Sequence, residues 1–137
     1  MKMANMAGLI ETIIVAAPLA RRLGIRLLAV GDGRLELALP FSPDNVTVGN
    51  TVHGGAIASL IDIVGAGLSC LVADPERHTG GATATLDVNY LRPALGIDLV
   101  GRGVILRAGR TSLVSEVEVR APDDRLIAKG TVNSTLF

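Results

Sequence analysis

Residues 53–73 read HGGAIASLIDIVGAGLSCLVA, and this stretch decides the fold. From Gly54 to Ala73 nearly every residue is apolar or small, and Asp62 carries the sole charge. The length would suffice to cross a bilayer. However, an Asp at the centre of a span costs about 3 kcal/mol on insertion scales, and no basic flank marks an orientation. We therefore predict a helix over 53–73 that is buried within its own domain.

A helical wheel divides this stretch by side-chain size rather than by polarity. One arc carries large apolar side chains, which we assign to the core: Ile57, Leu60, Ile61, Val64, Leu68, Leu71 and Val72. The other arc carries short side chains together with the acid: Ala58, Ser59, Asp62, Gly65, Ala66 and Ser69. Asp62 thus projects from a face that a second backbone or a slender ligand can approach closely.

Patterns typical of strands surround this helix. Apolar-rich runs precede it at 25–30 and 34–40, joined by a Gly-Asp-Gly turn, and four more follow it at 81–91, 98–107, 111–120 and 125–136. At the start of the chain Glu11 interrupts the apolar stretch that a signal peptide would need, so residues 1–22 are expected to form an amphipathic helix. We predict one α+β domain over 1–137, a mostly antiparallel curved sheet of five or six strands wrapped around the helix, which is the hotdog fold.

The amino-acid composition argues against several classes of binding partner. The 13 Lys and Arg residues balance 13 Asp and Glu residues, and aromatic residues make up 2 %, so we expect no nucleic acid partner. The single cysteine, Cys70, cannot form an internal disulfide, which favours a reducing, cytoplasmic location without membrane association. His53 and His78 with scattered acids form no recognisable metal set, so neither a metal nor a cofactor is expected.

The start of the predicted helix carries a second chemical feature, His53-Gly54-Gly55. Free N–H groups of a first helical turn favour a developing negative charge, and glycines let a ligand approach them. Gly54 lies eight residues before Asp62, or about 12 Å along the axis, so both cannot contact one carbonyl within one subunit. If both act in one reaction, the site lies between two subunits, and the protein is at least a homodimer.

The roles of the two polar residues stay open at this stage. Asp62 can accept a proton from water or attack a carbonyl itself, or it can be a structural acid bonded to neighbouring backbone. His53 can transfer a proton directly, although a histidine beside a helix start more often orients or caps it.

These residues resemble a known family. Residues 53–62, HGGAIASLID, are similar to the His-Gly-Gly, Leu-x-Asp signature of PaaI-like hotdog thioesterases. Residues 83–94, TATLDVNYLRPA, resemble the strand that follows in that family, and Gly109-Arg110-Thr111 resembles its later turn. The resemblance implies hydrolysis of acyl-CoA, with CoA as part of the substrate, by dimers that often pair into a homotetramer.

The resemblance also assigns roles by position. It implies that the Gly54 N–H polarises the thioester carbonyl, that Asp62 of the partner subunit acts as base or nucleophile, and that Thr83 holds the water. It places Gly109, Arg110 and Thr111 near the CoA arm, and we include Gly55 and Arg92 among the expected substrate contacts. The family often has an Asn six residues before the histidine; this chain has Thr47 there, so Asn45 or Asn50 would have to substitute.

Two other functions remain open from the sequence. Related hotdog proteins hydrate or dehydrate acyl thioesters with a His and an acidic residue, and His53 is available for that role. The missing Asn makes a non-catalytic acyl-CoA binding module the other alternative.

Overall fold

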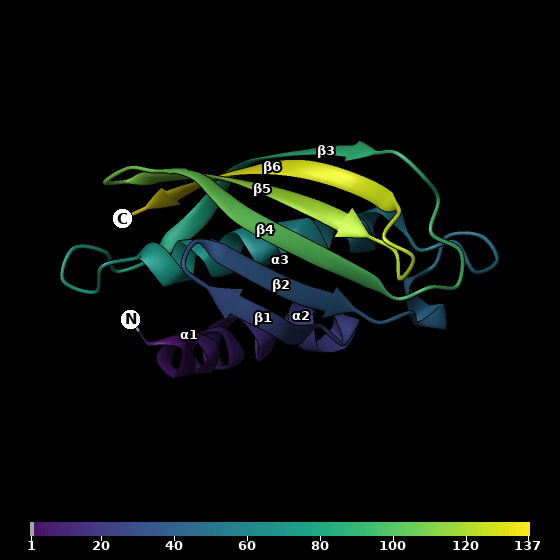
Figure 1. The fold of residues 1–137 in the computed structure, drawn as a ribbon, viewed down its shortest axis with the longest axis horizontal. Helices are drawn as coiled ribbons and strands as arrows, with labels where there is room; N and C mark the ends of the chain where they lie inside the picture. Colours follow the sequence, from purple (N-terminus) through teal and green to yellow (C-terminus); the bar gives the residue numbers. More distant parts are fainter. Residues whose placement is uncertain (1) are drawn as a thin grey trace.

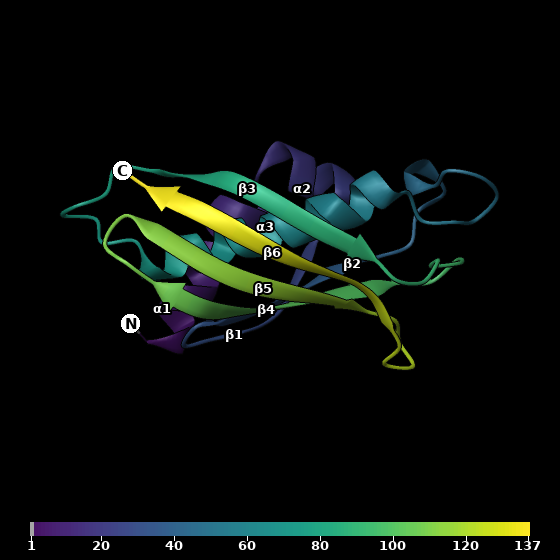
Figure 2. The same ribbon diagram turned by 90° about the horizontal axis from the view of Figure 1, so that it is seen from above.

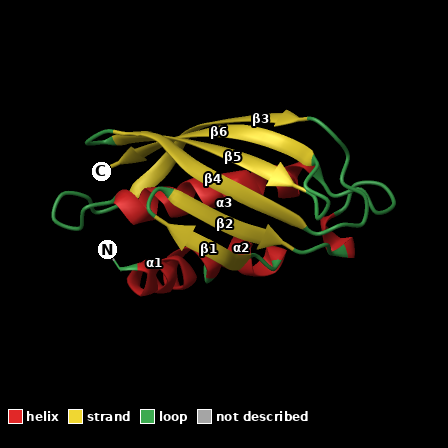
Figure 3. Ribbon diagram, viewed as in Figure 1, coloured by secondary structure: helices red, strands yellow, loops and turns green. Residues whose placement is uncertain are grey.

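Six strands form a single antiparallel sheet in the order β1-β2-β4-β5-β6-β3 in the computed structural model, which describes residues 2–137. Their bounds are β1 Arg26–Gly31, β2 Arg34–Leu39, β3 Gly81–Tyr90, β4 Leu99–Ala108, β5 Ser112–Arg120 and β6 Leu126–Leu136. Each predicted run agrees with one strand to within one residue at either end. Figure 3 shows the strands as one layer with the helices on its concave side.

Helix α3, Gly54–Val72, runs along the concave side of this sheet and contacts five of its strands (Figures 1 and 2). Leu60, Val64 and Leu68 are fully buried between helix and sheet. By length and composition α3 could also cross a membrane, but half of it is buried inside the structure, as a core helix is. The predicted hotdog fold, a curved sheet around a long central helix, is confirmed.

Glycines let α3 lie unusually deep in the sheet. A Cβ on Gly103 of β4 would lie 2.4 Å from Val64 Cγ1, and one on Gly101 would lie 3.0 Å from Leu60 Cγ. On the helix side, a Cβ on Gly65 would lie 2.6 Å from Val132 Cγ1. The wheel placed Gly65 on the open face with Asp62, and this was wrong, because Gly65 is buried against β6; Ser69, from the same arc, is buried too.

The N-terminal segment is not the single helix expected over 1–22. It consists of α1 (Met3–Leu9), a π-helix at Ile10–Val15 and α2 (Pro18–Leu23), and Met1 lies outside the described residues. Ala17 is extended, and Pro18 then starts α2, as its fixed φ and missing N–H favour at a first helical position. The buried side chains Ile10 and Ile14 face α3, where Gly67 leaves room for them.

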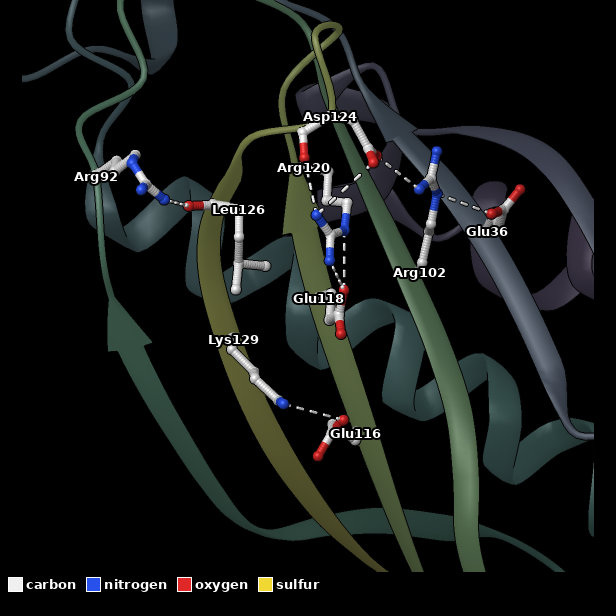
Figure 4. Close-up of polar contacts among 9 residues, drawn as sticks. All are labelled: Glu36, Arg92, Arg102, Glu116, Glu118, Arg120, Asp124, Leu126 and Lys129. Carbon is white, nitrogen blue, oxygen red and sulfur yellow. Dashed lines mark hydrogen bonds and ion pairs between the residues drawn. The ribbon is translucent and has the colours of Figure 1, made fainter.

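The outer face of the sheet is charged. Glu36, Arg102, Glu118 and Lys129 lie opposite one another on β2, β4, β5 and β6, so the sign alternates across the sheet. Figure 4 shows the resulting ion pairs, with Arg102 Nε 3.0 Å from Glu36 and Lys129 Nζ 3.4 Å from Glu116. Exposed pairs of this kind add about 0–1 kcal/mol each. This face therefore suits contact with water.

Candidate active site

Asp62 projects from the open side of α3 toward the edge strand β3. The Thr83 hydroxyl donates a hydrogen bond of 2.7 Å to Asp62 Oδ1. Within residues 2–137 no hydrogen-bond donor or ion-pair partner reaches Asp62 Oδ2. A half-exposed carboxylate with one oxygen fixed and the other free is suited to meet a water molecule or a substrate carbonyl.

A β-bulge in β3 brings Thr83 to this position. Thr83 pairs with Ser134 of β6, but Thr85 pairs with Asn133, so the register shifts between them. Leu86 is paired with the buried Val132, so its side chain faces the helix. Strict alternation back from Leu86 would turn Thr83 outward, whereas the extra residue in the bulge turns it inward, toward Asp62.

One N–H group is free at the start of α3. His53 is the N-cap, and its Nδ1 accepts the Gly55 N–H at 2.7 Å. The next two N–H groups, of Ala56 and Ile57, donate to the His53 carbonyl at 2.9 and 3.1 Å. The Gly54 N–H has no acceptor within residues 2–137. His53 thus makes a capping contact, which occupies the N–H of Gly55. The N–H of Gly54 is the one that remains available to a ligand.

Tyr90, at the end of β3, covers Gly54, and sequence reasoning missed this contact. The Tyr90 hydroxyl donates to the Gly54 carbonyl at 2.8 Å, and its ring lies 3.4 Å from where a Gly54 Cβ would be. Both residues line a cavity of about 250 Å³, together with Arg92, which donates to the Leu126 carbonyl at 3.0 Å (Figure 4). No local pattern indicates this contact, because residues 36 apart in the chain form it.

The two candidate asparagines lie in different surroundings. The Asn45 carbonyl accepts the His53 N–H at 2.8 Å, which places Asn45 beside the helix start, and its buried Nδ2 has no partner within residues 2–137. Asn50 instead lies beside Gly96, whose N–H donates to the Asn50 carbonyl at 2.9 Å. Thr47 is exposed and donates to Thr51. Of these residues, Asn45 is the one whose backbone contacts the N-cap of α3 and whose amide nitrogen lacks a partner within residues 2–137.

The predicted CoA-arm turn lies at the far end of α3. His78 Nε2 is 2.8 Å from the Arg110 carbonyl, and the Thr111 carbonyl accepts the Leu136 N–H at 2.9 Å. Gly109, in the same turn, donates to Ser112 at 2.8 Å. Figure 1 places this turn and the loop after α3 at one end of the molecule, opposite the loop before α3. Since α3 is 19 residues long, or about 28 Å, one subunit does not bring this turn to Gly54.

A larger cavity of about 620 Å³ begins at Thr83, the hydrogen-bond partner of Asp62. It reaches Thr83 at one end and runs along the open face of α3 past Ala66 and Cys70 to Ala73. Burial raises the pKa of the Cys70 thiol above its ordinary value. Within residues 2–137 no group of three His, Cys, Asp or Glu side chains is arranged to hold a metal ion.

Comparisons with known proteins agree with this geometry. The family model described as "Thioesterase superfamily" matches residues 49–128. A protein of Halobacterium salinarum is 36 % identical over 91 % of this chain and 84 % of its own length. The medium/long-chain acyl-CoA thioesterase YigI of Salmonella typhimurium is 33 % identical over 88 % of this chain and 86 % of its own. The structure of Escherichia coli PaaI, from the phenylacetic acid degradation operon, superposes with a TM-score of 0.85 over 99 % of this chain and 96 % of its own at 17 % identity, a likeness of fold. With a match over more than half of its length, the chain belongs to the thioesterase superfamily.

Proposed function

We propose that the protein hydrolyses an acyl-CoA thioester to the free acid and CoA in an active site shared by two subunits. YigI is named for acyl-CoA hydrolysis, which supports CoA as the leaving group. One observation carries the shared site: a free N–H at Gly54 and a hydrogen-bonded carboxylate at Asp62 stand about 12 Å apart on one helix. Each subunit then contributes one half of each of two active sites.

The exposed edge of the sheet offers the means of association. All of β3 except Val88 is exposed, so its outer N–H and C=O groups are available to a second copy of the chain. Along β3, Tyr90 contacts Gly54 of α3 and Thr83 contacts Asp62 of α3. An antiparallel pairing that sets Tyr90 opposite the partner's Thr83 unites the two halves, with the symmetry axis near Leu86.

The same pairing accounts for the CoA arm. Within one subunit the turn at residues 109–111 lies at the far end of α3 from Gly54. In the paired dimer, this turn of the second subunit would lie beside Gly54 of the first. Arg92 of one subunit and Arg110 of the other would then flank the entrance, where guanidinium groups can pair with phosphate. The contacts expected of Gly109, Arg110 and Thr111 thus require the second subunit.

The chemistry follows from the two halves. The Gly54 N–H, at the positive end of α3, stabilises the negative charge that develops on the carbonyl oxygen. In one route Asp62 takes a proton as water adds to the carbonyl carbon, the C–S bond breaks, and the CoA thiolate recovers that proton. In the other route an Asp62 oxygen displaces CoA, and water then cleaves the mixed anhydride. Thr83 holds the carboxylate in place for both.

Asn45 is our candidate for the second donor to the carbonyl. Its Nδ2 is unpartnered, and its backbone is fixed to His53 next to Gly54. A buried amide donor without a partner costs about 1–3 kcal/mol, and a rotation of the Asn45 side chain toward a bound carbonyl oxygen would relieve that cost. Asn45 would thereby replace the amide that Thr47 cannot supply.

Oligomer size and location are also proposals. The shared site requires a homodimer, and we propose that two dimers pair into a homotetramer. Light scattering distinguishes the two masses. A reduced, half-buried thiol at Cys70 supports a cytoplasmic location.

The test uses variants that each remove one half-site. Asp62→Asn removes the base, and Gly54→Pro removes the N–H at the first helical position, where proline is tolerated. We expect each to lower kcat by at least about 100-fold. Gly54→Ala is the matched control: it keeps the N–H, its Cβ meets Tyr90 only at ordinary contact distance, and it should retain most activity.

Mixing the two inactive variants tests the sharing of the site. Half of the dimers in a randomly reassembled equal mixture contain one chain of each kind, and each of these has one intact site, so about a quarter of wild-type activity should return. A mixture that assembles into such dimers but stays inactive would show that each active site lies within one subunit.

A further inference from the structure

We propose that the 620 Å³ cavity beside Asp62 binds an aliphatic acyl chain of medium length, and that Leu9 and Ile13 of the N-terminal segment form its outer wall and set its chain-length preference. This inference rests on the proposed function, because the acyl chain enters the cavity from a thioester held at Asp62. The occupant is the tail of the substrate rather than a second protein.

The position of the cavity supports this occupant. Thr83 belongs both to the cavity wall and to the hydrogen bond with Asp62, and Ala66 follows Asp62 by one helical turn on α3. An acyl group whose carbonyl carbon lies at Asp62 therefore has the cavity directly beside it. The acyl chain does not have to cross the buried core of the protein to reach the cavity.

The lining of the cavity suits a hydrocarbon. Among the described residues 2–137, no Asp, Glu, Lys or Arg lines it, and most polar groups in its wall have internal partners. Ser69 donates to the Gly65 carbonyl, and Thr79 donates to the Phe137 carbonyl. His78 accepts the Asp74 N–H with Nδ1 and contacts the Arg110 carbonyl with Nε2. The unpartnered Ser134 hydroxyl is 3 % exposed, so it is not presented to a ligand.

The N-terminal segment forms the outer wall of the cavity with side chains that are not needed for its packing on α3. The π-helix, widened by one residue per turn, directs Ile10 into the core and leaves Ile13 and the buried Ile14 along the cavity, with Leu9 at the end of α1 beside them. Ile13 is 51 % exposed, a high value for a large apolar side chain in a segment that packs on α3. An acyl chain in the cavity would cover it. π-helical turns are frequent at functional sites.

The length of the cavity sets the expected chain. Ala73 lies eleven residues beyond Asp62, or about 16 Å along α3. An extended chain advances about 1.2 Å per bond, as three backbone bonds per residue do, so about a dozen bonds fit. Decanoyl and dodecanoyl groups should therefore fill the cavity, and palmitoyl should exceed it.

Kinetics with a series from acetyl-CoA to palmitoyl-CoA tests the proposal. We expect kcat/KM to rise by up to about fourfold for each added methylene until the cavity is full. Ile13→Ala should lower the ratio of kcat/KM for decanoyl-CoA to that for butyryl-CoA by about tenfold, and Ala73→Phe should lower it at least as much by filling the far end. Leu19→Ala is the matched control, because Leu19, 55 % exposed against 51 % for Ile13, belongs to the same segment but is not among the described residues that line the cavity.

Cys70 gives a readout that needs no hydrolysis. Because its thiol lines the cavity, saturating decanoate should slow its alkylation by a maleimide at least tenfold, whereas acetate should not. In Ile13→Ala the protection by decanoate should weaken. Light scattering on the same variant shows whether the dimer persists.

The outcomes separate the two proposals. Protection of Cys70 without any acyl-CoA hydrolysis would support the cavity and overturn the proposed function. Hydrolysis with no protection, and with the same chain-length profile in wild type and both cavity variants, would overturn the cavity proposal alone. Dissociation of the dimer by Ile13→Ala would also overturn it, because a second copy would then occupy the cavity.

Discussion

At the scale of single residues, the site depends on which polar atoms remain free. Thr83 occupies one oxygen of Asp62, His53 occupies the N–H of Gly55, and the N–H of Gly54 and the amide of Asn45 are left over. Sequence reasoning reached Asp62 and Gly54 because a lone acid on a small-residue face and glycines at a helix start have few other uses. It left the role of His53 open, and the structure shows a capping contact of 2.7 Å between its Nδ1 and the Gly55 N–H.

The hydroxyl of Thr83 gives the first prediction at this scale. Thr83→Val keeps the shape of the side chain but removes the donor, so Asp62 should lose its fixed orientation. Hydrogen bonds to charged groups contribute about 1.5–3 kcal/mol, so kcat should fall by about 10- to 100-fold. Thr83→Ser keeps the donor and should stay within a few fold of wild type. Equal losses in both variants, measured by release of free thiol, would contradict this role.

The thiol of Cys70 gives a prediction of pH dependence. Burial raises its pKa above the ordinary value of 9.0, so the folded state holds the proton where the unfolded chain releases it. Stability should therefore be unaffected below pH 9 and should decline as the pH rises past it. Cys70→Ala should remove this alkaline decline. Urea unfolding midpoints of both proteins at several pH values measure the difference.

At the scale of elements, close approach between α3 and the sheet decides the packing. A Cβ on Gly65 would lie 2.6 Å from Val132, a fully buried β-branched side chain with little freedom to move. Gly65→Ala should thus destabilise the fold by about 1–3 kcal/mol, although alanine favours a helix. Gly8→Ala is the control: Gly8 is exposed in α1 with open space around it, and the change should stabilise by about 0.5–1 kcal/mol. Urea unfolding measures both.

Helices and strands could be predicted from the sequence where the local spacing of apolar residues alone determines them. Strand alternation and the apolar run of α3 were predicted almost to the residue, because the pattern of burial has the period of the element. The bulge at Thr83, the buried position of Gly65 and the break at Ala17 were not predicted. Each of these depends on a neighbour distant in the chain, or on a backbone irregularity that no spacing of apolar residues records.

At the scale of the whole molecule, association should be a condition of activity. Leu86 is 39 % exposed near the centre of the free edge of β3, and Leu86→Lys would place charges close to the proposed symmetry axis. We expect a monomer by light scattering, with loss of hydrolysis. Leu106→Lys is the control, since Leu106 is 56 % exposed on the interior strand β4. An active monomeric Leu86→Lys would disprove the shared site.

The glycines of β4 have a consequence for how this catalyst could be altered. Because the sheet lacks side chains at 101 and 103, the helix rests directly on the backbone, and its height there fixes how far Asp62 stands from Thr83. A single methyl group added behind the helix would lift the carboxylate without touching any reactant. Selections for changed turnover should therefore recover substitutions on this hidden side of the helix as well as in the pocket.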